Sequence, residues 1–137
     1  MKKNTLGNTL DALTIPARYD EDLGEGIVRC YACAHRCTLK SGQRGICKMR
    51  FNHNGELRVP WGYVAAAAID PIEKKPFMHF LPGSSAMTFG MLGCNFHCDF
   101  CQNWVSSQTL RDPASDSSVS YVQPITPQEL VDYGRHL

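Results

Sequence analysis

Seven cysteines are the residues of this 137-residue chain whose spacing points most directly to chemistry. They fall into two groups, which are Cys30, Cys33, Cys37 and Cys47, followed by Cys94, Cys98 and Cys101. An odd number of cysteines cannot all pair in internal disulfides, and a reducing compartment disfavours disulfides in any case. The pattern therefore predicts thiolate ligands for metal at two separate sites.

The second group places three thiolates at C-x3-C-x2-C spacing within eight residues, Cys94 to Cys101. A cubane iron–sulfur cluster has four irons, each of which takes one outside ligand, and thiolates are the usual donors. Three cysteines leave one iron open to a substrate or cofactor, as a catalytic zinc keeps one position open. The simpler alternative is a C-x2-C redox or zinc pair with an unrelated third cysteine.

The first group supplies four thiolates within 18 residues, from Cys30 to Cys47. Four thiolates suit a closed tetrahedral zinc site or a second, fully ligated cluster, either of which would be structural or relay electrons. Gly42 and Gly45 favour the tight turn that returns Cys47 to the other three ligands. His35 is a spare ligand that four thiolates make unnecessary, and four buried free cysteines are the alternative without metal.

The run Gly93-Cys94-x3-Cys98-Asp99-Phe100-Cys101 resembles the signature loop of the radical S-adenosylmethionine enzymes, including the aromatic before the third cysteine. This resemblance implies a [4Fe-4S] cluster on Cys94, Cys98 and Cys101, with S-adenosylmethionine chelating the fourth iron and Phe100 lying against its adenine. It also implies an electron donor such as flavodoxin or ferredoxin, which drives cleavage of S-adenosylmethionine to a 5′-deoxyadenosyl radical.

Further segments resemble one branch of that family, the pyruvate formate-lyase activating enzyme-like proteins, and within it the radical S-adenosylmethionine member of the AmmeMemoRadiSam system. These segments are residues 70–76, 79–84 and 94–104 together with the first cysteine group. The resemblance covers roughly residues 28–110 and leaves the substrate open among a protein glycine, a modified RNA and a small molecule. It assigns no catalytic residue beyond the cluster ligands, and we expect His97 and Asp99 to be solvated or cluster-facing loop positions.

The elements that must position the cysteines are expected to form an α/β fold, because the resemblance implies a partial barrel of six β/α units. Residues 85–92 are predicted to be a strand buried on both faces of a parallel sheet, with the cluster loop at its C-terminal end. Thr126-Pro127-Gln128-Glu129 predicts a capping box and the start of a helix. Only the first β/α unit can be assigned, so we expect an inactive fragment, a degraded gene product or a subunit completed by another chain.

The remaining segments divide the chain into four predicted regions. Residues 1–27 are expected to be a loosely ordered lead-in, 28–59 the cysteine-rich module, 60–84 an extended connector and 85–137 the start of the barrel. Within the module, Asn54-Gly55 favours a hairpin because both positions tolerate positive φ. The serine-rich segment 105–120 has no clear period and predicts a flexible loop.

Composition and charge exclude several classes of function. The chain is 43% hydrophobic with a net charge of +1, which gives no overall bias towards nucleic acid or membranes. It contains no apolar run of membrane-spanning length and starts without a signal peptide, so we expect a cytoplasmic protein without a membrane partner. Residues 29–58 contain seven basic residues and one acidic residue, Glu56. This excess of positive charge suggests an alternative function, a zinc-ribbon-type nucleic-acid-binding module. Only Tyr31 and Phe51 supply aromatics there, and basic side chains also balance thiolates, so nucleic acid is not the expected partner.

Overall fold

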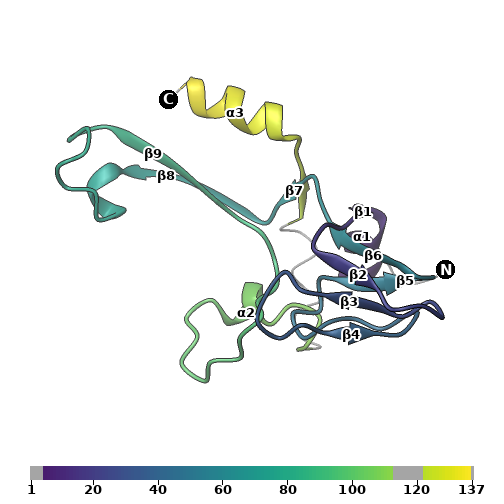
Figure 1. The fold of residues 1–137 in the computed structure, drawn as a ribbon. Helices are drawn as coiled ribbons and strands as arrows, with labels where there is room; N and C mark the ends of the chain where they lie inside the picture. The colour runs from purple at the N-terminus through teal and green to yellow at the C-terminus, as the bar shows by residue number, and fades with distance from the viewer. Residues whose placement is uncertain (1–4, 113–121, 137) are drawn as a thin grey trace. The chain divides into compact units, whose positions relative to one another are not determined.

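The computed structural model describes residues 5–112 and 122–136 of the chain (Figure 1). These residues belong to two compact units. The first unit comprises Met1–Trp61 and Leu92–Ser120, and the second comprises Gly62–Met91 and Tyr121–Leu137. Both cysteine groups lie in the first unit.

The N-terminal segment contains regular structure where the sequence predicted a loosely ordered lead-in. Helix α1 spans Leu6–Ala12, and the side chains of Leu6 and Leu10 are fully buried. Strands β1 (Thr14–Pro16) and β2 (Asp20–Asp22) follow it. Leucines four residues apart lie on the same face of a helix, so two apolar side chains are enough to anchor this short element. The prediction of loose order was wrong for these residues.

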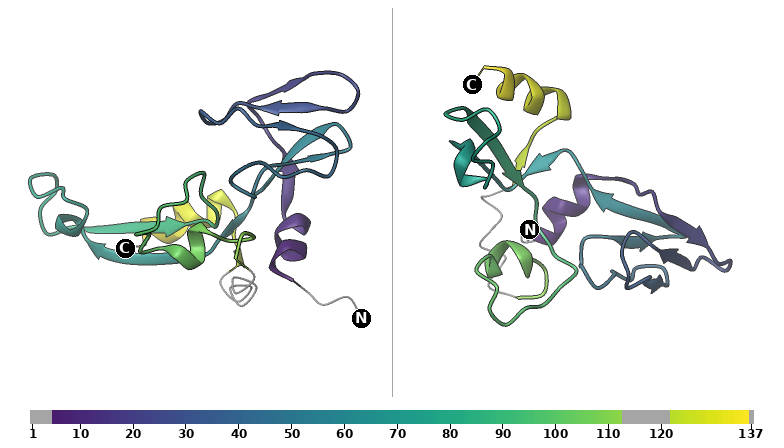
Figure 2. Two further views of the ribbon diagram at one scale, coloured as in Figure 1. Left: turned by 90° about the horizontal axis from the view of Figure 1, so that it is seen from below. Right: turned by 60° about the vertical axis from the view of Figure 1, so that its left-hand side comes forward.

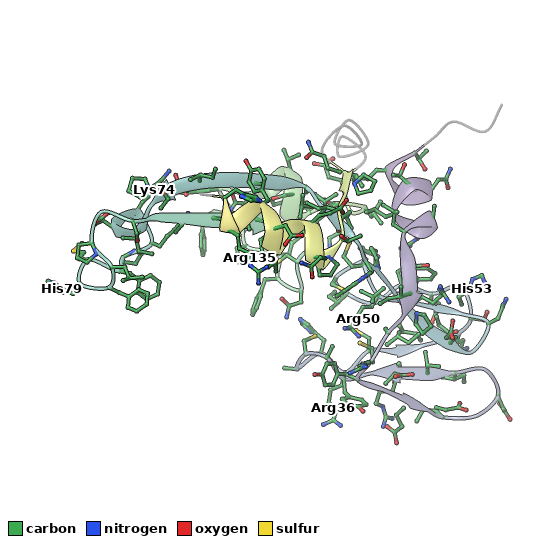
Figure 3. The ribbon with its side chains drawn as sticks, turned by 90° about the horizontal axis from the view of Figure 1, so that it is seen from above. Arg36, Arg50, His53, Lys74, His79 and Arg135 are labelled. Carbon is green, nitrogen blue, oxygen red and sulfur yellow. The ribbon has the colours of Figure 1, made fainter. Side chains whose placement is uncertain are left out.

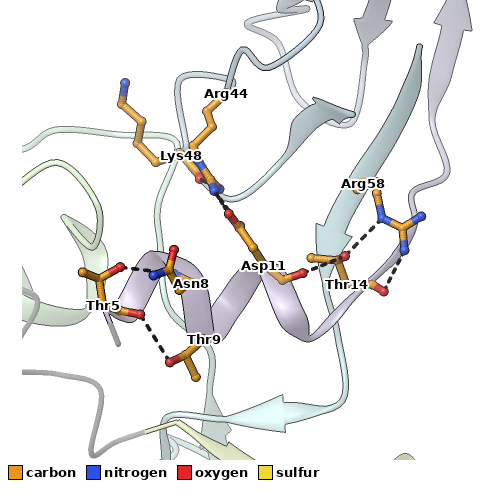
Figure 4. A network of polar contacts seen from close by, with 8 residues as sticks. All are labelled: Thr5, Asn8, Thr9, Asp11, Thr14, Arg44, Lys48 and Arg58. Atoms are coloured by element: carbon orange, nitrogen blue, oxygen red, sulfur yellow. Dashed lines mark hydrogen bonds and ion pairs between the residues drawn. The ribbon is translucent and has the colours of Figure 1, made fainter. Parts of the chain in front are cut away.

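Polar contacts join this segment to the cysteine-rich module (Figure 4). Arg44 NH2 donates to both carboxylate oxygens of Asp11, at 2.5 and 2.6 Å, and its NH1 donates to the Lys48 carbonyl at 3.1 Å. Arg58 donates to the hydroxyl and the carbonyl of Thr14, at 3.1 and 3.0 Å. Charge-assisted hydrogen bonds between an arginine and a carboxylate are short and strong, so these contacts make the N-terminal segment part of the module's fold.

Two three-stranded antiparallel sheets form the body of the first unit. They contain β3 (Val28–Cys30), β4 (Thr38–Leu39), β5 (Phe51–His53) and β6 (Glu56–Pro60), in the orders β1–β6–β5 and β2–β3–β4. A small core of buried residues consists of Val28, Cys30, Leu39 and Leu57. Cys30 therefore belongs to the hydrophobic core of the sheets. Cys33 and Cys37 lie in the loop between β3 and β4, and Cys47 lies between β4 and β5.

The predicted hairpin between β5 and β6 is confirmed. Asn54 and Gly55 have φ of 53° and 89°, which places both in the left-handed region that such a turn requires. Next to the turn, the fully buried Asn52 donates to the carbonyls of Gly26 and Leu39, at 2.7 and 2.8 Å, and accepts from the Gly55 N–H at 2.8 Å. This amide therefore joins the hairpin to the neighbouring sheet with all its contacts satisfied.

The second unit is built on a long antiparallel hairpin (Figure 2). Strand β8 (Ala66–Pro71) pairs with β9 (Ser85–Gly90) over six residues, and one turn of 3-10 helix, η1 (Ile72–Lys74), follows β8. Strand β7 (Tyr63–Val64) pairs with β10 (Gln123–Pro124). Two strands therefore lie within residues 60–84, which the sequence predicted to be an extended connector.

The predicted α/β fold, the first β/α unit of a radical S-adenosylmethionine partial barrel, is wrong for the described chain. The sheets are small and antiparallel, and β9 is mostly exposed and pairs with β8 alone. Parallel strands need a crossover connection, usually a helix, whereas antiparallel strands can be joined directly. Residues 72–84 contain only the single turn η1, so β8 and β9 pair as a hairpin.

Two further helices complete the described structure. Helix α2 spans Trp104–Ser107, at the start of the segment predicted to be a flexible loop, and residues 113–120 of that segment lie outside the described part. Helix α3 spans Pro127–Arg135, and its capping box is confirmed: Thr126 N–H donates to Glu129 Oε2 at 2.7 Å, and Glu129 N–H donates back to the Thr126 hydroxyl at 3.2 Å. None of the helices within residues 5–112 and 122–136 has the length and apolarity that a membrane crossing requires.

Candidate metal centre

One pocket in the first unit gathers cysteines from both groups. Its volume is about 470 Å³, and its wall includes Cys30, Cys33, Cys37, Cys47 and Cys94. Cys98 and Cys101 are not part of the wall. The sequence predicted two separate sites, and the structure instead brings the first cysteine of the second group beside the complete first group.

The loop between β3 and β4 presents three of these cysteines. Cys30 ends β3 with 7% of its surface exposed, and its N–H donates to the Cys37 carbonyl at 2.8 Å, which closes the loop. Cys33 and Cys37 are half-buried. Arg36, which precedes Cys37, has a φ of 48°, a strained left-handed conformation for a residue with a side chain. Strain of this kind persists where the surrounding structure imposes it, and here it bends the chain beside a cysteine.

The fourth cysteine of this group is held on a neighbouring turn. Gly45 leaves space beside Cys37, because a Cβ built on it would stand 3.5 Å from the Cys37 Sγ. The next N–H, that of Ile46, donates to the same Sγ at 3.5 Å. Cys47 follows directly, and Lys48 has a φ of 62°.

The donor chemistry of the pocket fits a metal. Four thiols are the ligand set of a structural zinc site or a cluster, and an N–H aimed at a sulfur is a contact that tunes such centres. The volume exceeds the requirement of one ion, since a water molecule takes about 30 Å³ of liquid. In the described ranges, however, no three of the Cys, His, Asp and Glu side chains converge in a metal-binding arrangement. Binding therefore requires the thiols to turn inward.

The three-cysteine loop has its own contacts to sulfur. Phe96 N–H donates to the Cys94 Sγ at 3.4 Å, and the Cys101 Sγ lies 3.2 Å from the hydroxyl of Ser107 on α2. Cys101 N–H donates to the Cys98 carbonyl at 3.1 Å, which forms a turn between these two cysteines. All three thiols are half-buried. As donors they fit three corners of a cubane cluster, which would require the loop to close around it.

The aromatic residues of this loop fall into two classes. Phe100 is 87% exposed and contributes nothing to the core. His97 packs edge-on against Trp104, with ring centroids 5.1 Å apart, and the indole N–H of Trp104 donates to Asp112 at 3.0 Å. Trp104 therefore orients the loop from α2, and its indole ring packs against His97.

Two residues that the sequence placed in a featureless loop hold this site together. Gln108 is 1% exposed and donates to the Phe96 carbonyl at 3.2 Å. Arg111 donates to the carbonyls of Phe96 and Cys94, at 3.0 and 3.4 Å, and also to the carbonyl of Ile46. No local pattern could have identified them, because their partners lie up to 65 residues away.

Three of the module's seven basic residues are paired with carboxylates in the described part of the chain. Arg29, Arg44 and Arg58 form ion pairs with Glu21, Asp11 and Glu56. Arg50 donates to a backbone carbonyl, that of Arg18, at 2.7 Å, while Arg36 extends from the β3–β4 loop (Figure 3). Carboxylates from the N-terminal segment thus neutralise charges that looked unopposed within residues 29–58. This pairing reduces the positive field available to a phosphate backbone.

The acidic groups with shifted titration lie in the second unit. The ammonium groups of Lys74 and Lys75 donate to Asp70, at 2.6 and 2.7 Å, and lower the pKa of its carboxyl. The Gly83 N–H donates to Glu73 at 2.8 Å and lowers the pKa of that carboxyl in the same way. Lys74 lies with His79 at the loop end of the hairpin (Figure 3). These contacts brace the turn between β8 and β9.

The chain is similar to two archaeal proteins whose printed names assign no function. It is 43% identical over 117 residues to the uncharacterized protein MJ0808 of Methanocaldococcus jannaschii, an alignment that covers 85% of this chain and 33% of that protein. It is 29% identical over 115 residues to the uncharacterized protein MJ0674 of the same organism, covering 78% of this chain and 26% of that protein. The chain therefore spans about a third or less of each relative. No protein-family model and no solved structure matches it.

Proposed function

We propose that this chain carries the cluster loop of a radical S-adenosylmethionine enzyme of the activating-enzyme-like type. Cys94, Cys98 and Cys101 hold a [4Fe-4S] cluster, and S-adenosylmethionine binds the iron without a protein ligand. The observation that carries the proposal is the presence of three half-buried thiols on one eight-residue loop. Three thiolates satisfy three irons of a cubane and leave one open to a ligand.

The cofactors supply the chemistry of this reaction. When these cofactors are bound, one electron from a donor of the flavodoxin or ferredoxin class would cleave the sulfonium C–S bond of S-adenosylmethionine. The products are methionine and a 5′-deoxyadenosyl radical. The chain holds the sulfurs in place: Phe96 N–H and the Ser107 hydroxyl contact those of Cys94 and Cys101. Hydrogen bonds of this kind raise the reduction potential of a cluster. Phe100, 87% exposed, offers an apolar ring face on which adenine can stack.

The four-cysteine pocket carries a second centre in this proposal, either zinc or a fully ligated cluster. Cys30, Cys33, Cys37 and Cys47 all line one pocket, which supports a structural or electron-relaying role once their thiols turn inward. Thiolate ligation of this kind requires reduced cysteines, which favours a cytoplasmic location. A protein substrate is compatible with an activating-enzyme role. The nucleic-acid-binding alternative gains no support from the arginines, three of which form ion pairs with carboxylates.

Anaerobic reconstitution with iron, sulfide and a thiol reductant tests the cluster loop. We expect the wild-type chain to assemble a reducible cluster whose electron paramagnetic resonance spectrum changes on addition of S-adenosylmethionine. Exchange of Cys98 and Cys101 for serine should abolish that response. The matched control is Cys33→Ser with Cys37→Ser, which leaves the three loop ligands in place, so the cluster that does assemble should still respond to S-adenosylmethionine. An unchanged spectrum in the Cys98 and Cys101 double variant would refute the assignment.

A further inference from the structure

Arg111 contacts the backbone of both cysteine groups. Arg111 NH2 donates to the Ile46 carbonyl, on the turn that carries Cys47, and to the Cys94 carbonyl at 3.4 Å. Its NH1 donates to the Phe96 carbonyl at 3.0 Å. One planar guanidinium therefore holds backbone from both groups in a fixed relative orientation, which a flexible ammonium could not do.

A buried amide fixes the position of that arginine. Gln108, 1% exposed, accepts from Arg111 NH1 at 2.9 Å through its carbonyl oxygen. Its amide nitrogen donates to the Phe96 carbonyl at 3.2 Å and to the Ser107 hydroxyl at 3.1 Å. The amide thus uses both ends, and a side chain that is almost fully buried leaves the guanidinium little freedom to turn.

Ile46 connects Arg111 to a cysteine sulfur of the first group. Ile46 N–H donates to the Cys37 Sγ at 3.5 Å, and its carbonyl accepts from Arg111. The next residue is Cys47. Metal ligation by Cys37 and Cys47 would restrain the backbone of Ile46, and the Arg111 hydrogen bonds join that backbone to the loop that starts at Cys94.

Two further contacts join the same two segments independently of Arg111. His35 lies within the β3–β4 loop, and its Nε2 donates to the Asn95 carbonyl at 2.9 Å, since a carbonyl oxygen can only accept. Met49 occupies the space beside Gly93, where a Cβ would overlap its side chain. Both contacts lie next to the wall that the four cysteines of the first group share with Cys94.

We propose that Arg111 is a positioning residue that couples the two sites: metal bound by Cys30, Cys33, Cys37 and Cys47 orders the backbone of residues 94–96 for cluster binding. This inference rests on the proposed function for its biological meaning, but the coupling itself is a property of the chain. Coupling between sites is reciprocal, so a cluster on the loop also strengthens metal binding in the four-cysteine pocket.

Cobalt(II) alone is the probe for the test, because thiolate ligation gives it a charge-transfer absorption. The background chain carries Cys98→Ser and Cys101→Ser, so that the metal has the complete ligand set only in the first group. Anaerobic hydrogen–deuterium exchange then reports on the amides of residues 94–97 with and without cobalt. We expect cobalt to slow their exchange about tenfold, the scale of one charge-assisted hydrogen bond.

Three variants in that background separate coupling from general damage. Arg111→Gln should keep the cobalt absorption and lose the slowing of exchange, and Arg111→Lys should lose most of it. Arg29→Gln is the matched control, because it removes the same charge from an exposed pair with Glu21 and should behave as the parent. If Arg111→Gln fails to fold, the lysine variant alone decides the question.

The coupling is refuted if cobalt binds without slowing exchange at residues 94–97, if it does not bind at all, or if both Arg111 variants retain the slowing. None of these outcomes depends on a [4Fe-4S] cluster, because the background lacks two of its ligands. Failure of the cluster proposal would instead appear in the reconstitution experiment with the intact loop.

Discussion

Gly93 provides the sharpest test of how the cluster loop meets the four-cysteine module. Its φ is +90°, and its N–H donates to the Ser106 carbonyl at 2.8 Å. In Gly93→Ala, the new Cβ would overlap the Cγ of Met49 and lie 3.0 Å from its Sδ and 3.1 Å from its Cε. Met49 is only 8% exposed, so its side chain cannot simply move into solvent.

The expected loss of stability has two parts. A residue with a Cβ pays about 1–2 kcal/mol for left-handed backbone. Forcing an extra carbon into a packed site costs about 1–3 kcal/mol more, depending on how far Met49 can shift. Gly93→Ala should therefore lower the free energy of unfolding by about 2–5 kcal/mol, a large share of the roughly 5–15 kcal/mol typical of native proteins.

Gly42 supplies the matched control. Its φ is +80° and nothing lies within 4 Å of a Cβ built there, so Gly42→Ala carries the backbone cost without the overlap. We expect it to cost about 1–2 kcal/mol. Combining Gly93→Ala with Met49→Ala removes the overlap, so the double variant should be more stable than the sum of the single losses by about 1–3 kcal/mol.

Urea unfolding of the reduced, metal-free chains measures these differences, with circular dichroism and tryptophan fluorescence followed together to check for one transition. An osmolyte such as trimethylamine oxide keeps the weakest variant folded at the start of the titration. Equal losses for Gly93→Ala and Gly42→Ala, with no coupling to Met49→Ala, would mean that Met49 does not pack on Gly93. This packing contact between the two cysteine segments would then be refuted.

Three further predictions concern groups outside the pocket. Lys74 and Lys75 lower the folded-state pKa of Asp70. The contribution of Asp70 to stability is therefore present above its unfolded-state pKa of about 4 and is lost as the pH falls through the lowered folded-state pKa. Carboxyl NMR titration measures the folded-state pKa, and Asp70→Asn should remove this part of the pH dependence of stability. Asn52→Ala leaves three backbone groups without their partner and should cost about 3 kcal/mol in urea unfolding, whereas a loss below 1 kcal/mol would contradict its bridging role. Thr126→Ala removes the cap of α3 and should cost about 1 kcal/mol of helix stability, seen as a loss of helical circular dichroism, with Thr126→Ser as the variant that should retain it.

Local chemistry was readable in the sequence. The turn at Asn54-Gly55 and the capping box at Thr126 were predicted because each depends on residues within three or four positions of one another. In these cases backbone φ and short-range hydrogen bonds decide the conformation, and both are encoded by adjacent residue types.

The strand pairing and the order of the N-terminal segment were not readable in this way. Residues 85–90 form a strand, but an apolar stretch does not specify which strand pairs with it. In the structure β8 is its antiparallel partner. Leu6 and Leu10 lie in a segment predicted to be loosely ordered, and the fold buries them completely. Burial is a property of what packs against a residue, which no short window contains.

The sequence by itself determined the chemistry available to this protein: two sets of thiols, one of four and one of three, with ligand spacing for metal. Only the tertiary structure decided that Cys94 joins the wall of the first set and that Arg111 ties the two sets together. Spacing is a property of the covalent chain, so it survives without a fold. Proximity across 65 residues depends on loop closure and on the burial of Gln108 beside Arg111, and these exist only once the whole unit has folded.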